Sequence, residues 1–264
     1  MTRFLIFVEQ KGDEPRKASL EILSKAYGLA VSGDASVEAV AVGPVSENVK
    51  EKVLPYVSRF VQIAGPGLDS YTAEGVAAAL GIYAQESKPD VILAGATNLG
   101  RDFFPRLAVL LGSGIASDAT EMDIRDGAIH FVRPMYGGKV LSEVSFTATP
   151  ALATIRPNAY PVTQPGEARG EFVTKEVDVS GTIKTKVIRV ERQDRKRADL
   201  TEAETIVAPS GSCAGMITRH YEELFAKDPA RLEETRRISA RVWEFSKFLI
   251  EVAGVEDLGA RYDG

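Results

Sequence analysis

The chain has 264 residues, 44% of them hydrophobic, and its 32 Lys and Arg against 37 Asp and Glu give a formal net charge of −5. These values are ordinary for a globular protein, and the mildly acidic balance argues against a nucleic-acid-binding protein or one held on anionic lipid. The only cysteine, Cys213, excludes an intramolecular disulfide, and no apolar run approaches the roughly 20 residues of a membrane span, so we expect a cytoplasmic protein.

Strands and helices are predicted to alternate through the first 155 residues. Five short apolar runs of β-forming residues predict strands covered on both faces, at 4–8, 37–43, 59–64, 89–95 and 151–155. Helix-length stretches lie between them, at 17–31, 47–54, 72–86 and 101–111. This order predicts an α/β fold with an open, mostly parallel, Rossmann-like sheet and helices on both faces.

An antiparallel excursion is predicted after Gly114. Strand-like segments at 121–125, 128–134 and 140–147 are separated by turns at Asp126-Gly127 and Gly137-Gly138. Two more strands are expected at 170–177 and 185–191. We therefore predict a first domain over residues 1–192.

A short second segment is predicted after a charged linker at 193–204. Residues 205–208 are typical of another buried strand, and two helices are expected to follow within 205–264. In the second of these helices, apolar residues recur at steps of three and four between 232 and 252, which predicts one strongly apolar face.

The loop after the strand at 89–95 is the most informative candidate site. Gly95, Asn98, Gly100 and Arg101 lie between a buried strand and a helix, where α/β sheets bind ligands. Glycines allow close backbone approach, the helix N-terminus favours an anion, and Arg101 adds a forked cation, so this is a possible anion or nucleotide loop. The spacing matches no standard nucleotide fingerprint, and by spacing alone a tight strand-to-helix turn with a surface arginine is the commoner explanation.

Two further groups of residues suit a protein interface. Arg133 and Tyr136 stand beside the Gly-Gly turn and combine a forked cation with rigid aromatic area, although a plain hairpin tip is an equal alternative. Arg156 and Asn158 follow the strand at 151–155, so they are expected at a sheet end.

The segment Ser210-Gly211-Ser212-Cys213 lies between a predicted strand and a helix. A cysteine there has two interpretations, a reactive thiol near a helix N-terminus or an inert buried residue, of which the second is commoner.

Residues 1–207 resemble the N-terminal part of the alpha subunit of electron transfer flavoprotein. The resemblance rests on VILAGATNLGRDFFPRLAVLLGSGIASDATEMDI (91–124), FVRPMYGGKVLSEV (131–144), ATIRPNAYP (153–161) and RADLTEAETIV (197–207). It implies an electron carrier, not a catalyst of bond-making chemistry, in a heterodimer with a beta subunit that accepts electrons from flavin dehydrogenases.

The resemblance also implies FAD, but it changes character near residue 208. In the family this strand enters a Gly-rich SGGRG turn that opens the FAD-binding domain, whereas here the turn is PSGSCAG. Ser210, Gly211 and Ser212 occupy the position of the family's FAD turn in degenerate form. Residues 205–264 are then a truncated or substituted counterpart of that domain, and we expect that this chain alone does not bind FAD.

Residues 206–264 resemble part of the cysteine-rich lactate-utilisation and heterodisulfide-reductase-type iron–sulfur proteins. IVAPSGSCAGMITRHYEELFAKDPARLEE and ARVWEFSKFLIEVAGVEDLGARY carry this resemblance, with Cys213 at one cluster position. Two alternatives therefore stay open: an iron–sulfur oxidoreductase component in which a partner supplies the other ligands, and an adenine-nucleotide-binding α/β module with no redox role. No metal site is expected from this chain alone.

Overall fold

The computed structural model describes residues 1–33, 35–166, 170–190, 204–255, 257 and 259. The chain divides into two compact units, Met1–Val190 and Glu191–Gly264, and each is treated by itself. The predicted linker at 193–204 lies, except for Glu204, outside the described residues. Within the described part of the chain, the helices are too short or too polar to cross a membrane.

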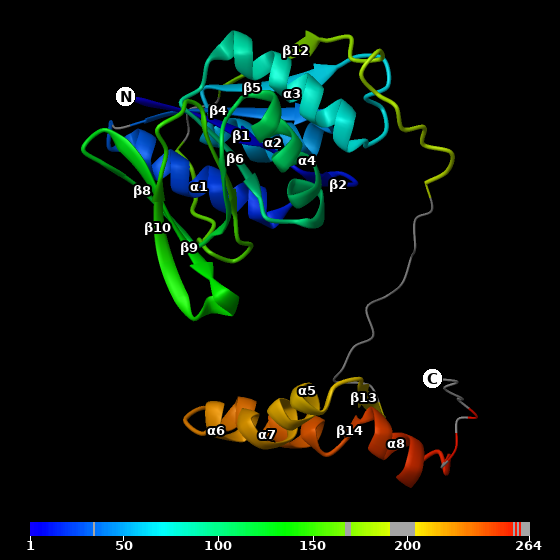
Figure 1. The fold of residues 1–264 in the computed structure, drawn as a ribbon. Coiled ribbons are helices and arrows are strands. Elements are labelled where there is room, and N and C mark those ends of the chain that lie inside the picture. The colour runs from blue at the N-terminus through cyan, green and yellow to red at the C-terminus, as the bar shows by residue number, and fades with distance from the viewer. Residues whose placement is uncertain (34, 167–169, 191–203, 256, 258, 260–264) are drawn as a thin grey trace. The chain divides into compact units, whose positions relative to one another are not determined.

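The first unit is built on a seven-stranded sheet in which every pairing is parallel (Figure 1). Its strands, in spatial order, are β12 (Glu171–Glu176), β5 (Arg59–Ala64), β4 (Ala35–Val42), β1 (Thr2–Phe7), β6 (Val91–Gly95), β11 (Ala151–Ile155) and β7 (Ile115–Ala119). All the residues of β6 and β11 are buried, because helices cover both faces of the sheet.

Four helices form the layers on either side of this sheet: α1 (Lys17–Val31), α2 (Glu47–Val53), α3 (Ala73–Ser87) and α4 (Asn98–Leu110). Buried side chains of α1 and α2 belong to one hydrophobic cluster, and those of α3 and α4 belong to another. A short 3₁₀ turn, Leu54–Tyr56, extends α2. The side chains of Ser46, Thr72 and Thr97 accept the backbone N–H three residues on, which fixes where α2, α3 and α4 begin.

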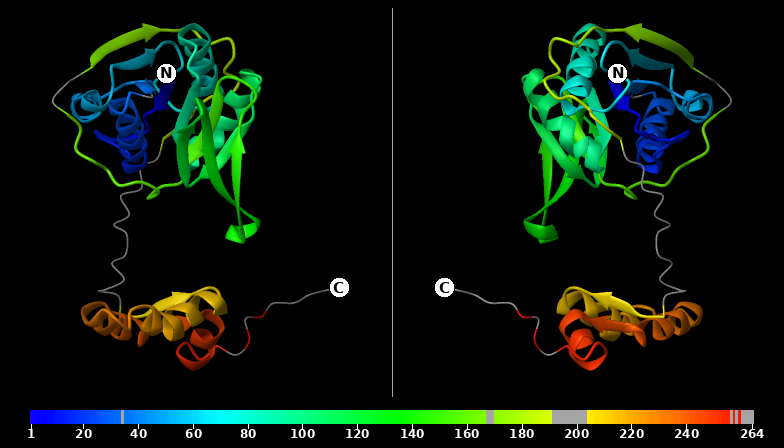
Figure 2. Two further views of the ribbon diagram at one scale, coloured as in Figure 1. Left: turned by 90° about the vertical axis from the view of Figure 1, so that its left-hand side faces the viewer. Right: turned by 90° about the vertical axis from the view of Figure 1, so that its right-hand side faces the viewer.

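A separate antiparallel sheet projects from the first unit (Figure 2). It consists of β8 (Glu121–Arg125), β9 (Ala128–Met135) and β10 (Val140–Ser145), with a 3₁₀ turn at Tyr136–Gly138. Phe131 and Met122 on one face of this sheet are buried in the same cluster as α1, which joins it to the main body. The predicted excursion is therefore confirmed.

The first unit differs from the prediction in three places. The edge strand β7 was not predicted, and neither was the small hairpin of β2 (Gln10–Lys11) and β3 (Glu14–Pro15). The predicted strand at 185–191 is wrong for its described residues, 185–190, which form no strand. The N–H groups of Lys184 and Thr185 instead donate to the carboxylate of Glu74, at 2.7 and 3.0 Å.

The second unit is a parallel two-stranded sheet with short helices. Its elements are β13 (Ile206–Ala208), α5 (Gly211–Gly215), a π-helical turn (Met216–His220), α6 (Tyr221–Leu224), α7 (Pro229–Ser239), β14 (Val242–Glu244) and α8 (Phe245–Glu251). The continuous helix predicted between 232 and 252 is wrong, because Val242–Glu244 pairs with Ile206–Ala208 as a strand. An apolar repeat of three and four fits a helix–strand–helix segment here as well as one helix.

Few side chains are fully buried in the second unit. Its hydrophobic cluster has three buried members, Ala208, Ala214 and Val242, with Ile206, Ile217 and Ile238 partly buried around them.

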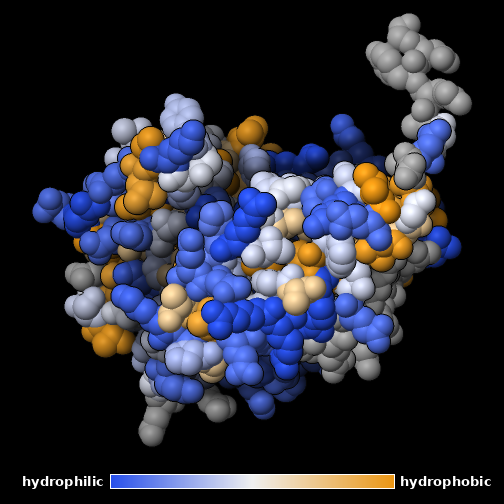
Figure 3. Space-filling model, turned by 90° about the horizontal axis from the view of Figure 1, so that it is seen from below, coloured by the Kyte–Doolittle hydropathy of each residue, from blue (hydrophilic) through white to orange (hydrophobic). Residues whose placement is uncertain are grey.

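On the face of the molecule drawn in Figure 3, hydrophilic residues dominate and hydrophobic residues gather in small separate groups.

Candidate functional site

The carboxyl ends of β1 and β6 meet where the chain reverses its course across the sheet. From β1 the chain adds β4 and β5 on one side, and then returns to add β6 on the other. Open α/β sheets bind ligands in the crevice at such a switch point. The loops after β1, β6 and β11 therefore form the candidate site, which contains most of the predicted residues.

Glu9, directly after β1, occupies the space at the start of α4. Its largely buried carboxylate accepts hydrogen bonds from Arg16 Nε, at 3.0 Å, and from the hydroxyl of Thr97. The same hydroxyl accepts the N–H of Gly100 at 3.1 Å. A carboxylate of the protein itself thus lies near the helix N-terminus at which the sequence predicts an external anion.

Packing accounts for both glycines of the predicted anion loop. A Cβ atom on Gly100 would lie 2.0 Å from the carbonyl oxygen of Gly95, and one on Gly95 would lie 3.1 Å from the Cβ of Ala18. Asn98 is exposed at the first residue of α4. The loop therefore needs its glycines for close backbone approach, whether or not it meets a ligand, and anion binding stays a prediction.

Arg101 and Arg156 converge on Asp118 of β7, a residue that the sequence analysis missed. Arg156 Nη2 lies 2.7 Å from Asp118 Oδ2, and Arg101 Nη2 lies 3.5 Å from Asp118 Oδ1. The hydrogen bond from Arg156 holds the pKa of the Asp118 carboxyl below its ordinary value. No sequence signal marked Asp118, because the strand that carries it was not predicted.

Asn158 is held against α1 instead. Its N–H donates to Glu21 Oε2 at 2.8 Å, and its side-chain Oδ1 accepts from Lys17 Nζ at 2.8 Å. Asn158 adopts a φ of 66°, in the left-handed region that asparagine tolerates better than most residues. Both Arg156 and Asn158 are exposed at the sheet end, as predicted.

Arg133 and Tyr136 lie apart from these residues, on the hairpin formed by β9 and β10, residues 128–145, which we call the hairpin arm. Tyr136 is 76% exposed and has a φ of 52°, so the turn presents an aromatic ring to solvent in a strained backbone conformation. The Nε atom of Arg133 is buried and has no hydrogen-bond partner among the described residues.

Leu141, on the same arm, is 66% exposed and was also missed. It pairs with Pro134 across the arm, next to the turn. Val140 and Leu141 are consecutive apolar residues in a strand, so they point to opposite faces of the sheet and only one of them can face the core. This signal was available in the sequence.

Ser210, Gly211, Ser212 and Cys213 lie at the junction of β13 and α5. The hydroxyls of Ser210 and Ser212 are 2.9 Å apart, within hydrogen-bond distance of each other. A Cβ on Gly211 would meet nothing closer than Glu244 Cγ, at 3.9 Å, so the glycine is not required by packing. Cys213 is exposed, which corrects the commoner expectation of a buried thiol.

The residues present do not support an iron–sulfur site. Within the described ranges, no three His, Cys, Asp or Glu side chains are placed to hold a metal ion. The sequence has one cysteine, whereas an iron–sulfur cluster generally needs four protein ligands. The predicted resemblance of residues 206–264 to cysteine-rich iron–sulfur proteins is therefore not supported.

Known proteins that resemble this chain in sequence belong to one family. The electron transfer flavoprotein domain matches residues 4–180. The chain is 32% identical over 215 residues to the electron transfer flavoprotein subunit alpha of Thermoanaerobacterium thermosaccharolyticum, covering 80% of this chain and 65% of that protein. It is 30% identical to the subunit alpha of Bacillus subtilis, covering 78% and 63%.

A third relative has a different name. The acryloyl-CoA reductase electron transfer subunit beta of Anaerotignum propionicum is 27% identical to the chain, with coverage of 77% of this chain and 64% of that protein. The chain thus spans slightly less than two thirds of the length of these relatives.

Proposed function

The chain belongs to the electron transfer flavoprotein family, and we propose that it acts as an alpha-subunit-like component of an electron carrier. Alpha subunits at about 30% identity over some four fifths of the chain are the observation that supports this role. We also propose a cytoplasmic location, where a single unpaired cysteine is expected to stay reduced.

We propose that the first unit supplies a docking platform for a beta subunit. Tyr136 and Leu141 give the hairpin arm exposed apolar area, and aromatic and arginine side chains are enriched among the residues that dominate binding. Arg133, which is half-buried on β9, adds a forked guanidinium to the same arm. Asn98, Arg101, Arg156 and Asn158 extend this proposed surface to the sheet end.

An adenine-nucleotide function is less well supported by the same loops. The N–H of Gly100 is already bonded to Thr97, and the carboxylate of Glu9 occupies the adjacent space. A phosphate at this position would face the negative charge of Glu9 at close range.

We propose that FAD, which the family implies, is not bound by this chain alone. A flavin dinucleotide needs a turn that approaches its pyrophosphate and walls that enclose its rings. The Ser210–Ser212 turn pairs its own hydroxyls, and its unit has a two-stranded sheet with three buried core residues among those described. These residues do not fit the cofactor, so we assign no electron-transfer step to them. Flavin dehydrogenases are the proposed electron donors to the complex.

The docking proposal is tested by binding of the chain to a tagged electron transfer flavoprotein beta subunit. Tyr136→Asn removes the aromatic ring and keeps a residue that tolerates a left-handed φ, so we expect it to weaken binding about tenfold or more. Val31→Asn is the matched control, because Val31 is also exposed and lies at the end of α1. Equal affinity of the Tyr136 variant and wild type would show that the arm is not the interface.

A further inference from the structure

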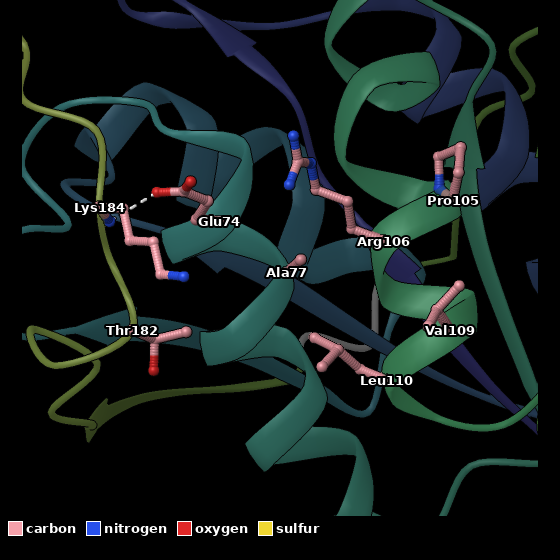
Figure 4. A pocket seen from close by; sticks show the side chains of 8 residues that line it. All are labelled: Glu74, Ala77, Pro105, Arg106, Val109, Leu110, Thr182 and Lys184. Atoms are coloured by element: carbon pink, nitrogen blue, oxygen red, sulfur yellow. Dashed lines mark hydrogen bonds between the residues drawn. The ribbon is translucent and has the colours of Figure 1, made fainter.

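A pocket of about 580 Å³ lies between α3, α4 and the segment at 182–184 (Figure 4). This volume is within the range of sites for small molecules. Ala77 of α3 is buried at its floor, whereas Val109 and Leu110 of α4 are 81% and 53% exposed. The pocket lies on the α3 and α4 side of the sheet and contains none of the residues of the candidate site described above.

The wall of the pocket opposite α4 is fixed in place. The carboxylate of Glu74 accepts the N–H groups of Lys184 and Thr185, at 2.7 and 3.0 Å, which ties this segment to α3. Val179 is buried in the same hydrophobic cluster as α3, and Ile183 packs against that cluster. This wall is therefore held in place without a ligand, which lowers the entropic cost of ligand binding.

Two cations enter the pocket without committed counter-ions. In Figure 4 the side chains of Arg106 and Lys184 reach in from opposite sides, with Ala77 between them. Neither side chain forms a salt bridge within the described parts of the chain, although Arg106 lies near enough to Glu74 to act on it electrostatically. The charged groups lining the pocket are Arg106, Lys184 and Glu74, which sum to one net positive charge.

Glu74 stays ionised at the wall of the pocket, so it offsets one of the two cations and leaves one net positive charge. Its Oε2 atom is engaged by two backbone N–H groups, which lower the pKa of the carboxyl, and Arg106 contributes a weaker electrostatic effect of the same sign. The hydrogen bonds of this carboxylate go to the backbone and not to the two cationic side chains, so the Arg106 guanidinium and the Lys184 ammonium keep their donor groups for a ligand.

We infer that this pocket binds a small amphipathic anion, with an acidic head between Arg106 and Lys184 and an apolar tail on Ala77, Val109 and Leu110. A carboxylate or phosphate head suits the forked guanidinium and the ammonium together. The hydroxyl of Thr182, which also lines the pocket, is a further donor for the head. Burial of the tail covers apolar side chains of α4 that are otherwise exposed to water.

The inference is tested with decanoate as the probe, by calorimetric titration of the full chain below the concentration at which decanoate forms micelles. Decyltrimethylammonium, which has the same tail and the opposite charge, is the ligand control. We expect decanoate to bind, the cationic analogue not to bind, and added salt to weaken the interaction. Decanoate should also perturb the backbone amide signals of α3 and α4.

Variants assign the head and tail contacts. Arg106→Gln and Lys184→Gln should each weaken decanoate binding about tenfold, and Leu110→Asp should abolish it, whereas Lys11→Gln, an exposed lysine on β2, should leave it unchanged. No binding of decanoate to wild-type chain, equal binding of the cationic analogue, or unchanged affinity in Arg106→Gln would overturn the inference. None of these results bears on docking of a beta subunit, because the readout is decanoate binding by the chain alone.

Discussion

At the end of the sheet, single carboxylates neutralise arginine side chains that come from other parts of the fold. Glu9 joins Arg16 to the cap of α4, and Asp118 joins Arg101 to Arg156. Each carboxylate comes from a loop or edge strand and holds cations from other elements. The polar residues that mark this edge in the sequence thus have a structural role beside any role in docking.

Asp118→Asn separates the charge of this residue from its backbone conformation. Asparagine tolerates the φ of 59° at least as well as aspartate, so the variant loses mainly the ion pairs, which are partly exposed, and we expect about 0.5–1 kcal/mol less stability to unfolding by urea at neutral pH. Asp118→Ala should lose about 1 kcal/mol more, since alanine is strained at this φ. Equal stability of the two variants would contradict this explanation.

The same carboxyl predicts a pH dependence. The pKa of Asp118 in the folded protein lies below the ordinary value of 3.8. Its contribution to the free energy of unfolding is therefore complete well above pH 3.8, and it is lost as the pH falls through the pKa of the folded protein. The difference in unfolding free energy between wild type and Asp118→Asn should therefore be constant from neutral pH to about pH 5 and shrink below about pH 4. If this difference in unfolding free energy grew as the pH fell, the pKa of Asp118 would be raised in the folded protein and not lowered.

Gly100 and Gly28 form a matched pair for the effect of an added methyl group. At Gly100 the new Cβ would meet the Gly95 carbonyl oxygen at 2.0 Å, so Gly100→Ala should destabilise the first unit by about 3 kcal/mol. At Gly28, inside α1, the Cβ would meet nothing within 4 Å, and alanine should stabilise by about 0.5–1 kcal/mol. Thermal unfolding of both variants measures the contrast, and a tolerated Gly100→Ala would refute the close approach.

Among the helices and strands, the sequence predicts best those whose own residues carry a clear hydrophobic pattern. The ends of α1, β5 and β8 agree with it to the residue. Strands that depend on distant partners were harder: β7 has a polar centre, Ser117-Asp118, and exists because it pairs with β11. The same reason explains β14, whose residues suit a helix until they meet β13.

The candidate site was predicted less completely than the fold. Arg101, Arg156 and Asn158 were expected at the sheet end, where the structure places them, because residues that follow parallel strands share one edge. Glu9 and Asp118 were missed, since nothing in a single sequence tells which carboxylate pairs with a given arginine. The ion pairs at this edge of the sheet therefore become visible only in the three-dimensional structure.

Val242 of β14 offers a test of the second unit. It is one of three buried hydrophobic residues described in that unit, so Val242→Ala should destabilise the unit by about 1 kcal/mol or more. Trp243 is the only tryptophan of the chain, so its fluorescence reports this unit. We expect the variant to shift the fluorescence transition in urea to lower concentration and to leave the circular dichroism transition of the larger unit in place.

At the scale of the whole molecule, the two units differ in how much core they bury. The first unit has two large hydrophobic clusters, whereas the one cluster described in the second has three buried members. In wild type, the transition of Trp243 fluorescence should therefore occur at a lower urea concentration than the main circular dichroism transition, because a small core supplies little stability. Coincident transitions would mean that the chain unfolds as one cooperative body.

We propose that this chain is an alpha-subunit-like platform that needs a beta subunit for its redox role and does not hold flavin alone. The most direct measurement is size-exclusion chromatography with flavin absorbance, on the chain purified alone and after co-expression with an electron transfer flavoprotein beta subunit. We predict a colourless chain alone and a one-to-one complex with the beta subunit. Stoichiometric flavin on the isolated chain, or elution of the two proteins as separate species, would contradict the account.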